Sequence, residues 1–451
     1  MKKLIIGAMM LAAVAQMSAA GKLDLKEITK GTFREATIAA VTPMSDGETY
    51  AQISADGKQI VQYSFKTGKQ VAVLFDVEKA RGAKLKKIDD YVMSPTGKRL
   101  LIQTETKSIY RRSFTAVYYI YHVANNKLEP LSDGGPQQTP VWSPDGEQVA
   151  FVRDNNIHLV KLLYNNAESQ VTKDGKFNEV INGIPDWVNE EEFSFNSSMV
   201  FTADSRQIVW IRYDESQVKE FSMPMFHLDA EDKGAYAYTY KYPKAGDDNS
   251  KVSLMSYDIK SHQTRQMQLP LDADGYIPRI VTTSDPAKVL AFTLNRHQDC
   301  LRVYAVNPLS TTCKLIVEDK VDKYINENVF ANLVVTDKHL VLTSERDGYN
   351  HIYLYNLNGQ LMRSVAQPSN LVVTEVYGYN DMTGDLYFAG YNDGPTDQKV
   401  FVSHKDGKMD CLTNKEGCST AIFSKDFKNF LCTWSDMNHP SVYTLCNNQG
   451  K

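Results

Sequence analysis

The sequence predicts an all-β fold: an eight-bladed β-propeller of four-stranded antiparallel blades, with a short helical insertion. Three observations predict it. A turn of the form Ser-x-Asp-Gly recurs along the chain, and short apolar runs flank its copies. The chain also contains 25 tyrosines, which suit strands, and no long stretch has the spacing of an amphipathic helix.

The repeated turn predicts the number of blades. Its copies begin at intervals of 40, 49, 59, 81, 53, 47 and 41 residues, and several replace Ser with Thr or lack the glycine. These intervals match or exceed the roughly 40–50 residues of a four-stranded blade. The two longest intervals indicate insertions, after Ser143 and after Thr202. The copies occupy residues 54–57, 94–97, 143–146, 202–205, 283–286, 336–338, 383–385 and 424–426.

The runs beside these turns have the pattern of paired strands. Residues 148–153 are mostly apolar, residues 154–156 read Asp-Asn-Asn, and residues 157–160 are apolar again. An apolar run, a tight polar turn and a second run predict a β-hairpin. A single blade cannot bury both faces of its sheet, whereas blades stacked in a closed ring bury them all.

Length and composition limit the class of protein. A chain of 451 residues is too long for one ordinary domain unless the fold is a repeat. Hydrophobic residues make up 42% and charged residues 23%, as in folded globular proteins. The net charge is −4, from 50 basic and 54 acidic residues, which argues against a nucleic acid as partner.

Residues 1–20 have the three parts of a secretory signal peptide. Lys2 and Lys3 precede an apolar run at residues 4–14, and Ser18-Ala19-Ala20 supplies the small residues of a cleavage site. We therefore expect export to the periplasm or the extracellular space. No other stretch reaches 18 apolar residues, so no membrane span is expected. We assign residues 21–50 to a lead-in, 51–446 to the propeller and 447–451 to the start of a linker.

Six cysteines, all at or after Cys300, fit an oxidising compartment. Six cysteines allow 15 pairings, so the sequence leaves the connectivity open. A zinc site competes with disulfides, but no Cys-x-x-Cys spacing occurs. Pairs that flank predicted hairpins are the candidate bridges, namely Cys300 with Cys313 and Cys418 with Cys432, which would leave Cys411 and Cys446 as a third pair.

A short stretch at residues 184–193 carries the candidate functional site. Asp186 follows a proline and precedes two apolar residues, which predicts a helix N-cap. Glu190, Glu191 and Glu192 would then lie in the first two turns, near the positive end of the helix dipole. Two interpretations remain open. The glutamates are the solvated face of a surface helix, or they bind a cation that relieves the repulsion between adjacent carboxylates.

Residues 182–193 resemble the double-glutamate motif of dipeptidyl peptidase IV, in the prolyl oligopeptidase family. In that family the motif lies in an N-terminal β-propeller, and its last two glutamates bind the free α-amino group of a peptide. The resemblance implies this role for Glu191 and Glu192. The family usually has tyrosine where this chain has Asn189. Further phrases follow in the family's order, at residues 213–216, 221–226, 236–246, 276–279, 294–298 and 344–349.

The resemblance implies one more substrate-binding residue. Residues 110–116 resemble the family segment whose arginine reaches into the substrate cavity, which implies that Arg111 contacts the carbonyl region of the peptide and helps to hold the glutamate pair. Side chains alternate along a strand, so only one of Arg111 and Arg112 is expected to face the cavity. The alternative is an ordinary surface arginine.

The family's catalytic residues have no counterpart in this sequence. Its Ser-Asp-His triad belongs to an α/β-hydrolase domain with a Gly-x-Ser-x-Gly elbow, and no such elbow occurs here. We therefore expect no catalytic residue in this chain. No His-Glu-x-x-His or phosphate-binding loop occurs, and residues 272–275 suit a turn rather than a calcium loop. No metal and no cofactor are expected.

Two functions are consistent with these observations. The first is the substrate-gating, N-terminus-binding propeller of an exopeptidase that releases Xaa-Pro dipeptides, with its catalytic domain elsewhere. The second is a stand-alone exported propeller that binds peptides or proteins without cleaving them, because propellers host many binding functions. The expected partners are a peptide with a free N-terminus, a separately encoded hydrolase domain and a second copy of the chain in a homodimer.

Overall fold

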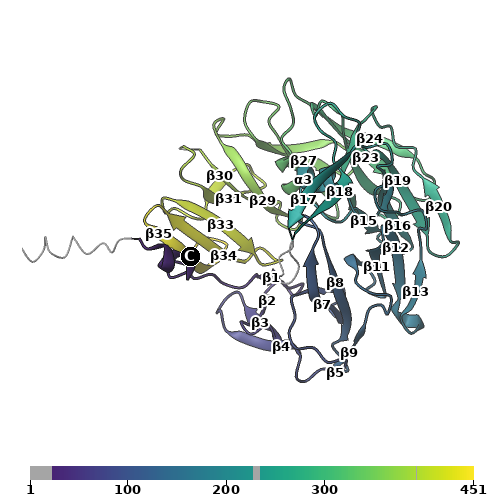
Figure 1. The fold of residues 1–451 in the computed structure, drawn as a ribbon. Helices are drawn as coiled ribbons and strands as arrows, with labels where there is room; N and C mark the ends of the chain where they lie inside the picture. Colours follow the sequence, from purple (N-terminus) through teal and green to yellow (C-terminus); the bar gives the residue numbers. More distant parts are fainter. Residues whose placement is uncertain (1–22, 227–233, 393) are drawn as a thin grey trace, which may run out of the picture.

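The computed structural model describes residues 23–226, 234–392 and 394–451, and there the chain forms eight successive β-sheets arranged as a ring of blades (Figure 1). Sequential strands within the blades pair antiparallel, and most blades have four strands. The predicted eight-bladed propeller is therefore confirmed. The signal peptide predicted at residues 1–20 lies outside the described residues.

The first four blades use strands up to β20. Blade 1 contains β1 (Thr42–Pro43), β2 (Thr49–Ile53), β3 (Gln59–Ser64) and β4 (Gln70–Asp76). Blade 2 contains β5 (Arg81–Gly82), β6 (Asp90–Met93), β7 (Arg99–Ser108), β8 (Phe114–His122) and β9 (Lys127–Pro130), with β5 parallel to β9. Blade 3 contains β10 (Gln138–Trp142), β11 (Gln148–Arg153), β12 (Asn156–Lys161) and β13 (Ala167–Gln170). Blade 4 contains β14 (Val180–Asn182), β15 (Met199–Phe201), β16 (Gln207–Asp214), β19 (Lys251–Asp258) and β20 (Gln263–Gln266).

The last four blades complete the ring. Blade 5 contains β21 (Tyr276–Thr282), β22 (Val289–Leu294), β23 (Cys300–Val306) and β24 (Cys313–Lys320). Blade 6 contains β25 (Val334–Val335), β26 (His339–Ser344), β27 (His351–Asn356) and β28 (Leu361–Val365). Blade 7 contains β29 (Val372–Asn380), β30 (Asp385–Tyr391), β31 (Lys399–Ser403) and β32 (Met409–Cys411). Blade 8 contains β33 (Cys418–Phe423), β34 (Asn429–Asp436) and β35 (His439–Asn447).

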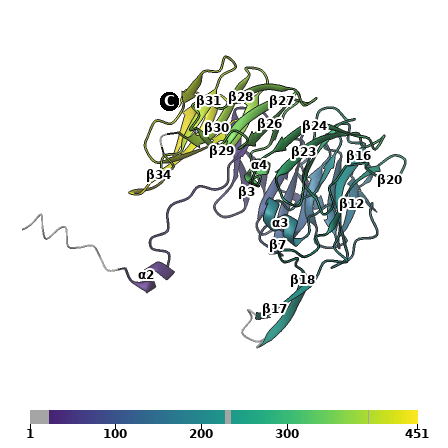
Figure 2. The same cartoon turned by 90° about the horizontal axis from the view of Figure 1, so that it is seen from above.

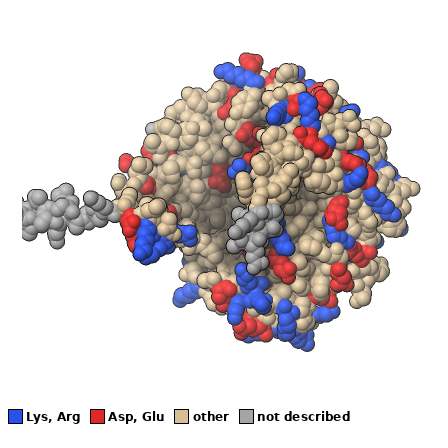
Figure 3. Space-filling view, in the orientation of Figure 1, with Lys and Arg blue, Asp and Glu red and all other residues tan. Residues whose placement is uncertain are grey.

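Few elements lie outside the blades. The hairpin of β17 (Glu220–Phe226) and β18 (Ala235–Lys241) is inserted in blade 4 and projects away from the ring (Figure 2). In the part of the chain that the structure describes, the helical segments are α2 (Leu25–Thr29), η1 (Leu162–Tyr164), α3 (Trp187–Phe193) and α4 (Asn328–Ala331). None of the helices in the described ranges is long and apolar enough to cross a bilayer. Acidic and basic side chains are interspersed on the face shown in Figure 3.

The Ser-x-Asp-Gly turn forms because its side chains bond to its own backbone. Between β10 and β11, the Ser143 hydroxyl accepts the Gln148 N–H at 2.9 Å, and Asp145 accepts the Glu147 N–H at 3.0 Å. Gly146 has a φ of +70°, which favours glycine. The Asp145 N–H also donates to the Ser205 hydroxyl of the next blade's turn, at 3.1 Å. The repeated turns therefore also connect neighbouring blades.

The first copy of the turn lies one strand later than the other seven. Residues 54–57 join β2 to β3, the second and third strands of blade 1. Each of the other copies joins the first strand of an antiparallel series within its blade to the second, as in β10 to β11. In blade 1 that place is taken by Ser45-Asp46-Gly47, where Asp46 accepts the Glu48 and Thr49 N–H groups. The blade therefore begins at Thr42, inside the segment 21–50 that we had assigned to a lead-in, and not at residue 51.

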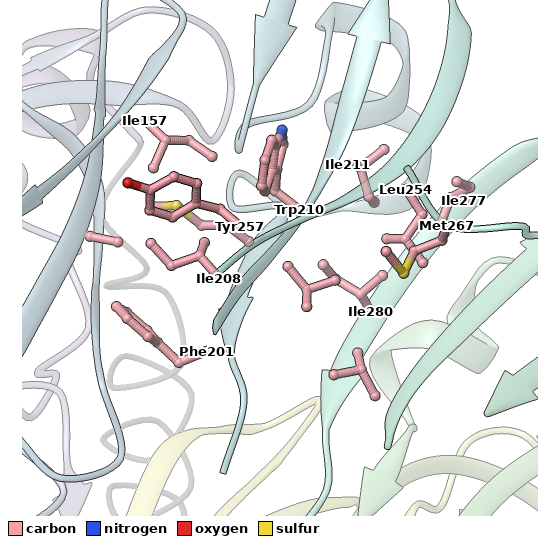
Figure 4. Packing of buried hydrophobic residues seen from close by; sticks show 14 of the residues in the cluster. Ile157, Phe201, Ile208, Trp210, Ile211, Leu254, Tyr257, Met267, Ile277 and Ile280 are labelled. Carbon is pink, nitrogen blue, oxygen red and sulfur yellow. The ribbon is translucent and has the colours of Figure 1, made fainter. Parts of the chain in front are cut away.

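Side chains from adjacent blades form the core. The cluster in Figure 4 centres on Trp210 and Ile208 of blade 4, which pack with Ile157 of blade 3 and Ile280 of blade 5. Each of these large side chains contributes about 1.5–3 kcal/mol through its burial. Blade 8 meets blade 1 in the same way, through Leu431 against Tyr50 and Phe65. The central strands are therefore buried on both faces, as stacked blades require.

The predicted disulfide bridges are not formed, and all six cysteines are free thiols. Cys300 lies opposite Lys320 and Cys313 opposite Val306, so the two occupy opposite ends of the β23–β24 hairpin, about 20 Å apart along the strands. Cys418 lies opposite Ser435 and Cys432 opposite Ala421. The prediction placed both pairs on hairpins correctly, but the register separates their side chains.

Candidate functional site

The helix α3 (Trp187–Phe193) begins where the sequence predicted, and Asp186 is its N-cap. The Asp186 Oδ1 atom accepts the Asn189 N–H at 2.9 Å and the Asn189 Nδ2 atom at 2.8 Å. Its Oδ2 atom accepts a hydrogen bond from the hydroxyl of Ser250, the residue just before β19. Asn189 stands where the family usually has tyrosine, and its amide here strengthens the cap. Burial raises the pKa of Asp186, and the hydrogen bonds from Ser250 and Asn189 oppose that rise.

Glu190 joins α3 to the loop between β7 and β8. Its Oε1 atom accepts the backbone N–H of Arg112 at 2.9 Å and that of Ser113 at 2.8 Å. The residue is only 2% exposed. Because this carboxylate satisfies two backbone donors, the first glutamate of the run is a structural group that fixes the position of the loop.

Arg111 and Glu191, two of the three predicted substrate-binding residues, lie in contact. The Arg111 Nε atom is 2.8 Å from Oε1 and 3.0 Å from Oε2 of Glu191. The side chains of Arg111 and Glu191 are 68% and 28% exposed, so the pair lies open to solvent on one side. A contact between residues 80 positions apart means that the loop and the helix form one surface.

Arg112 also reaches α3. Residues 109–113 lie in the loop between β7 and β8 rather than in a strand, so successive side chains need not point to opposite sides. The Arg112 Nη2 atom donates to the Ser194 hydroxyl at 2.8 Å. Ser194 ends the helix in a left-handed conformation, with a φ of +58°. Both arginines therefore contact the glutamate helix, Arg111 at a carboxylate and Arg112 at the C-cap.

Glu192, the third predicted residue, is exposed. No described residue forms an ion pair or hydrogen bond with its carboxylate. It follows Glu191 directly, so of these two adjacent carboxylates one is paired with Arg111 and the other has no partner among the described residues.

Sequence reasoning missed Arg279, which holds the C-terminal end of α3. Its Nη2 atom donates to the Phe193 carbonyl and its Nη1 atom to the Pro278 carbonyl, both at 2.6 Å. Its guanidinium also lies over the rings of Phe195 and Phe330. Burial lowers the pKa of Arg279 to about 10. The phrase at residues 276–279 drew attention to this arginine, but nothing in the sequence joins it to a helix 86 residues away.

The contacts of α3 locate it within the ring. The helix belongs to the insertion in blade 4, yet it touches the β7–β8 loop of blade 2 through Glu190 and strand β21 of blade 5 through Phe193. Phe193 also packs against Phe330 of α4, with ring centroids 5.7 Å apart. Figure 1 shows α3 toward the middle of the ring rather than on its outer edge. The helix therefore connects several blades.

A cavity of about 690 Å³ lies on the N-terminal side of α3, and we call it the α3 cavity. Trp187 and Glu190 line it, together with Tyr110, Glu215 and Tyr238. Arg111, Glu191 and Glu192 are not part of its wall. The helix therefore separates two surfaces, the charged one beside Arg111 and the α3 cavity behind it. Within residues 23–226, 234–392 and 394–451, no group of three His, Cys, Asp or Glu side chains could hold a metal ion.

Comparison with known proteins identifies the family. The profile described as "Dipeptidyl peptidase IV (DPP IV) N-terminal region" matches residues 94–441, more than half of the chain. The chain belongs to the dipeptidyl peptidase IV N-terminal region family. The resemblance stated from the double-glutamate motif is thereby confirmed. The matched region includes Arg111, the whole of α3 and Arg279.

Several relatives of this dipeptidyl peptidase IV region are similar over most of the chain. A probable dipeptidyl-aminopeptidase B of Aspergillus niger is 30% identical over 361 residues, covering 73% of this chain and 40% of the relative. The crystal structure of Porphyromonas gingivalis dipeptidyl peptidase 4 superposes with a TM-score of 0.91 at 38% identity, covering 95% of this chain and 60% of that one. A putative dipeptidyl aminopeptidase IV from Bacteroides ovatus shares the fold, with a TM-score of 0.67 at 17% identity. The chain thus spans about 40% of the length of the curated relatives it matches.

Proposed function

We propose that this chain is the propeller that binds the substrate N-terminus in a dipeptidyl peptidase. Glu191 and Glu192 would accept the α-ammonium group of a peptide, and Arg111 would contact the carbonyl of its first residues. The observation that supports the proposal is the Arg111–Glu191 contact beside the carboxylate of Glu192, which has no partner among the described residues. In this arrangement Arg111 orients one carboxylate, and the other remains available to a cation.

The arrangement would act as a ruler for cleavage. A peptide whose ammonium is held at the two carboxylates extends a fixed distance before it reaches a nucleophile. A nucleophile placed two residues away cleaves after the second residue, which releases an Xaa-Pro dipeptide. Charge-assisted hydrogen bonds to the ammonium would contribute about 2–4 kcal/mol once a catalytic domain excludes water from the site. Peptides with a blocked N-terminus would lose that contribution and be rejected.

The remaining parts of the proposal concern the whole enzyme. The relatives are named as dipeptidyl-aminopeptidases and are longer than this chain, so the nucleophile would come from an α/β-hydrolase domain. The propeller would cover that domain and restrict access to the active site. Export through the segment 1–20, to the periplasm or beyond, and a homodimeric assembly belong to the same proposal.

Peptide titration tests the binding role. We expect Ala-Pro-Ala to bind the chain in calorimetry, and N-acetyl-Ala-Pro-Ala to bind at least about tenfold more weakly, because it lacks the ammonium charge. Glu191→Gln and Glu192→Gln should each weaken binding of the free peptide. Glu416→Gln is the matched control, since its exposed side chain lies in the β32–β33 connection. Equal binding of the free and acetylated peptides would refute the ruler.

Activity assays distinguish a part of an enzyme from a stand-alone binding protein. The chain on its own is expected not to cleave Gly-Pro substrates. Joined to an α/β-hydrolase domain of the family, it is expected to support cleavage of Xaa-Pro substrates, and Glu191→Ala to abolish most of that activity. Peptide binding without any cleavage in the joined protein would favour the propeller that only binds peptides.

A further inference from the structure

The α3 cavity is built from parts that are far apart in the sequence. Its wall contains the β7–β8 loop, the turn between β11 and β12, the segment 175–178, the start of α3 and the base of the β17–β18 hairpin. Its volume of about 690 Å³ is that of a small-molecule site. The substrate-binding residues proposed above do not line it, so the cavity needs an explanation of its own.

Glu215 is a buried carboxyl group in this wall, and the described residues offer it no partner. The residue is 6% exposed, and its carboxyl forms no hydrogen bond or ion pair with any described residue. The other buried acids of the wall are engaged. Asp186 caps α3 and accepts Ser250, and Glu190 accepts two backbone N–H groups. Buried polar groups in proteins are normally paired, so Glu215 indicates a ligand that brings a donor.

The basic groups of the wall already have partners. Arg153 pairs with Glu168, and Lys176 pairs with Glu179. Lys241 donates to the carbonyl oxygen of Val218 at 2.8 Å and to that of Ser216 at 3.3 Å. When Glu215 is ionised, the unmatched buried charge in the wall is therefore negative, which favours a positively charged ligand over an anion.

Aromatic side chains complete the wall near Glu215. Tyr110, Trp187 and Tyr238 line the cavity. Tyr110 and Trp187 each pack against Tyr240, with ring centroids 5.9 and 5.8 Å apart. Aromatic faces attract cations, and aromatic groups beside a carboxylate are the usual surroundings of an organic ammonium ion. We propose that the α3 cavity is a second binding site, which takes an organic ammonium or guanidinium ion on an apolar body with Glu215 as its counter-ion.

The charges around Glu215 give this site a pH dependence. The pKa of Glu215 is raised to about 8, chiefly by burial and also by the charges of Asp186 and Asp214, while Lys241 opposes the rise. Glu190 and Tyr110 face the same space from α3 and the β7–β8 loop. A cation binds the ionised carboxylate, so its affinity should fall about tenfold for each pH unit below 8.

The test uses 2-phenylethylammonium and its uncharged analogue 2-phenylethanol. Both are titrated by NMR into the chain carrying Glu191→Gln and Glu192→Gln, so that the surface beside Arg111 does not compete for the ammonium. We expect the ammonium to bind, and Glu215→Gln added to this background to weaken it at least about tenfold at pH 8. The alcohol should bind equally to the background protein and to the protein that also carries Glu215→Gln. The pH dependence of ammonium binding should disappear with Glu215→Gln. Thermal melting checks that the variant is folded.

Two results would overturn the proposal. One is equal affinity of the ammonium for Glu215 and Glu215→Gln proteins, and the other is binding of the alcohol as tightly as the ammonium. Tyr238→Leu is a second variant, which removes an aromatic face and leaves Glu215 in place; unchanged ammonium affinity in it would exclude the aromatic contribution. Because Glu191 and Glu192 are already neutral in this background, the outcome does not depend on whether they bind peptides.

Discussion

Glu190 accepts the backbone N–H of Ser113 at 2.8 Å, across 77 positions of sequence. The same oxygen accepts the N–H of Arg112 at 2.9 Å, so one buried carboxylate holds the loop that carries Arg111. The three consecutive glutamates thus have different tasks. Glu190 fixes the loop, Glu191 receives the Arg111 guanidinium, and Glu192 is left exposed.

Glu190→Ala is expected to lower the free energy of unfolding by about 2–4 kcal/mol, because two backbone donors lose their acceptor. Glu190→Gln keeps an acceptor oxygen, so its unfolding free energy should fall by less. Urea denaturation measures the unfolding free energy of both variants. Glu192→Ala is the control, since its exposed side chain has no described partner, and it should change stability by no more than about 0.5 kcal/mol. Equal stability of Glu190→Ala and Glu192→Ala would contradict the conclusion that Glu190 holds the β7–β8 loop in place.

Arg279→Met is expected to loosen the C-terminal end of α3. The substitution removes the donors to the Phe193 and Pro278 carbonyls and the cation over two aromatic rings. We expect a loss of about 1–3 kcal/mol in unfolding free energy and faster hydrogen exchange in the peptide that covers α3. Arg279→Lys keeps the charge but cannot donate to both carbonyls in the same geometry. Its unfolding free energy should therefore lie between those of Arg279→Met and the unsubstituted chain. Unchanged exchange in Arg279→Met would show that the helix end is held by other contacts.

Glu215 should make the stability of the chain depend on pH in a defined direction. In the unfolded chain its carboxyl titrates near 4.5, and in the folded chain near 8. Between these values the unfolded chain binds fewer protons, so the contribution of Glu215 to stability falls as the pH rises. Glu215→Gln should therefore gain about 1–4 kcal/mol relative to the unsubstituted chain between pH 4.5 and pH 8. Denaturation curves at pH 4.5 and pH 8 test this. The same change in unfolding free energy between the two pH values for the unsubstituted chain and for Glu215→Gln would contradict it.

The free cysteines should react with iodoacetamide in an order set by exposure. Cys418 is exposed, whereas burial raises the pKa of both Cys313 and Cys432 to about 11. The thiolate is the reactive form, so Cys418 should be alkylated at least about tenfold faster than the other two. Peptide mapping by mass spectrometry gives the rates. Fewer than six thiols in denaturant without reductant would instead reveal a disulfide bridge.

The parts of the fold that could be predicted depend on local chemistry. Ser143 and Asp145 bond to the backbone within five residues, and Asp186 caps a helix that starts at the next residue. Such bonds leave a readable pattern in the sequence. The turn at residues 54–57 has the same chemistry as the others, so the sequence alone could not show that it lies one strand later.

The parts that could not be predicted depend on register and on distant contacts. The cysteine pairing required the strand register, which places Cys300 opposite Lys320. The hydrogen bond from Arg279 to the Phe193 carbonyl joins residues 86 positions apart, and the wall around Glu215 combines segments from many separate parts of the chain. Arg111 and Glu191 were singled out through the family resemblance, and the structure brings them into contact.

The short helix α3 also has an evolutionary consequence. It contacts blade 2 through Glu190, blade 5 through Arg279 and α4 through Phe330, so these distant stretches of the gene share one joint. A substitution at any of them displaces the others, and selection should act on them together. We therefore expect positions 190, 279 and 330 to covary among homologues.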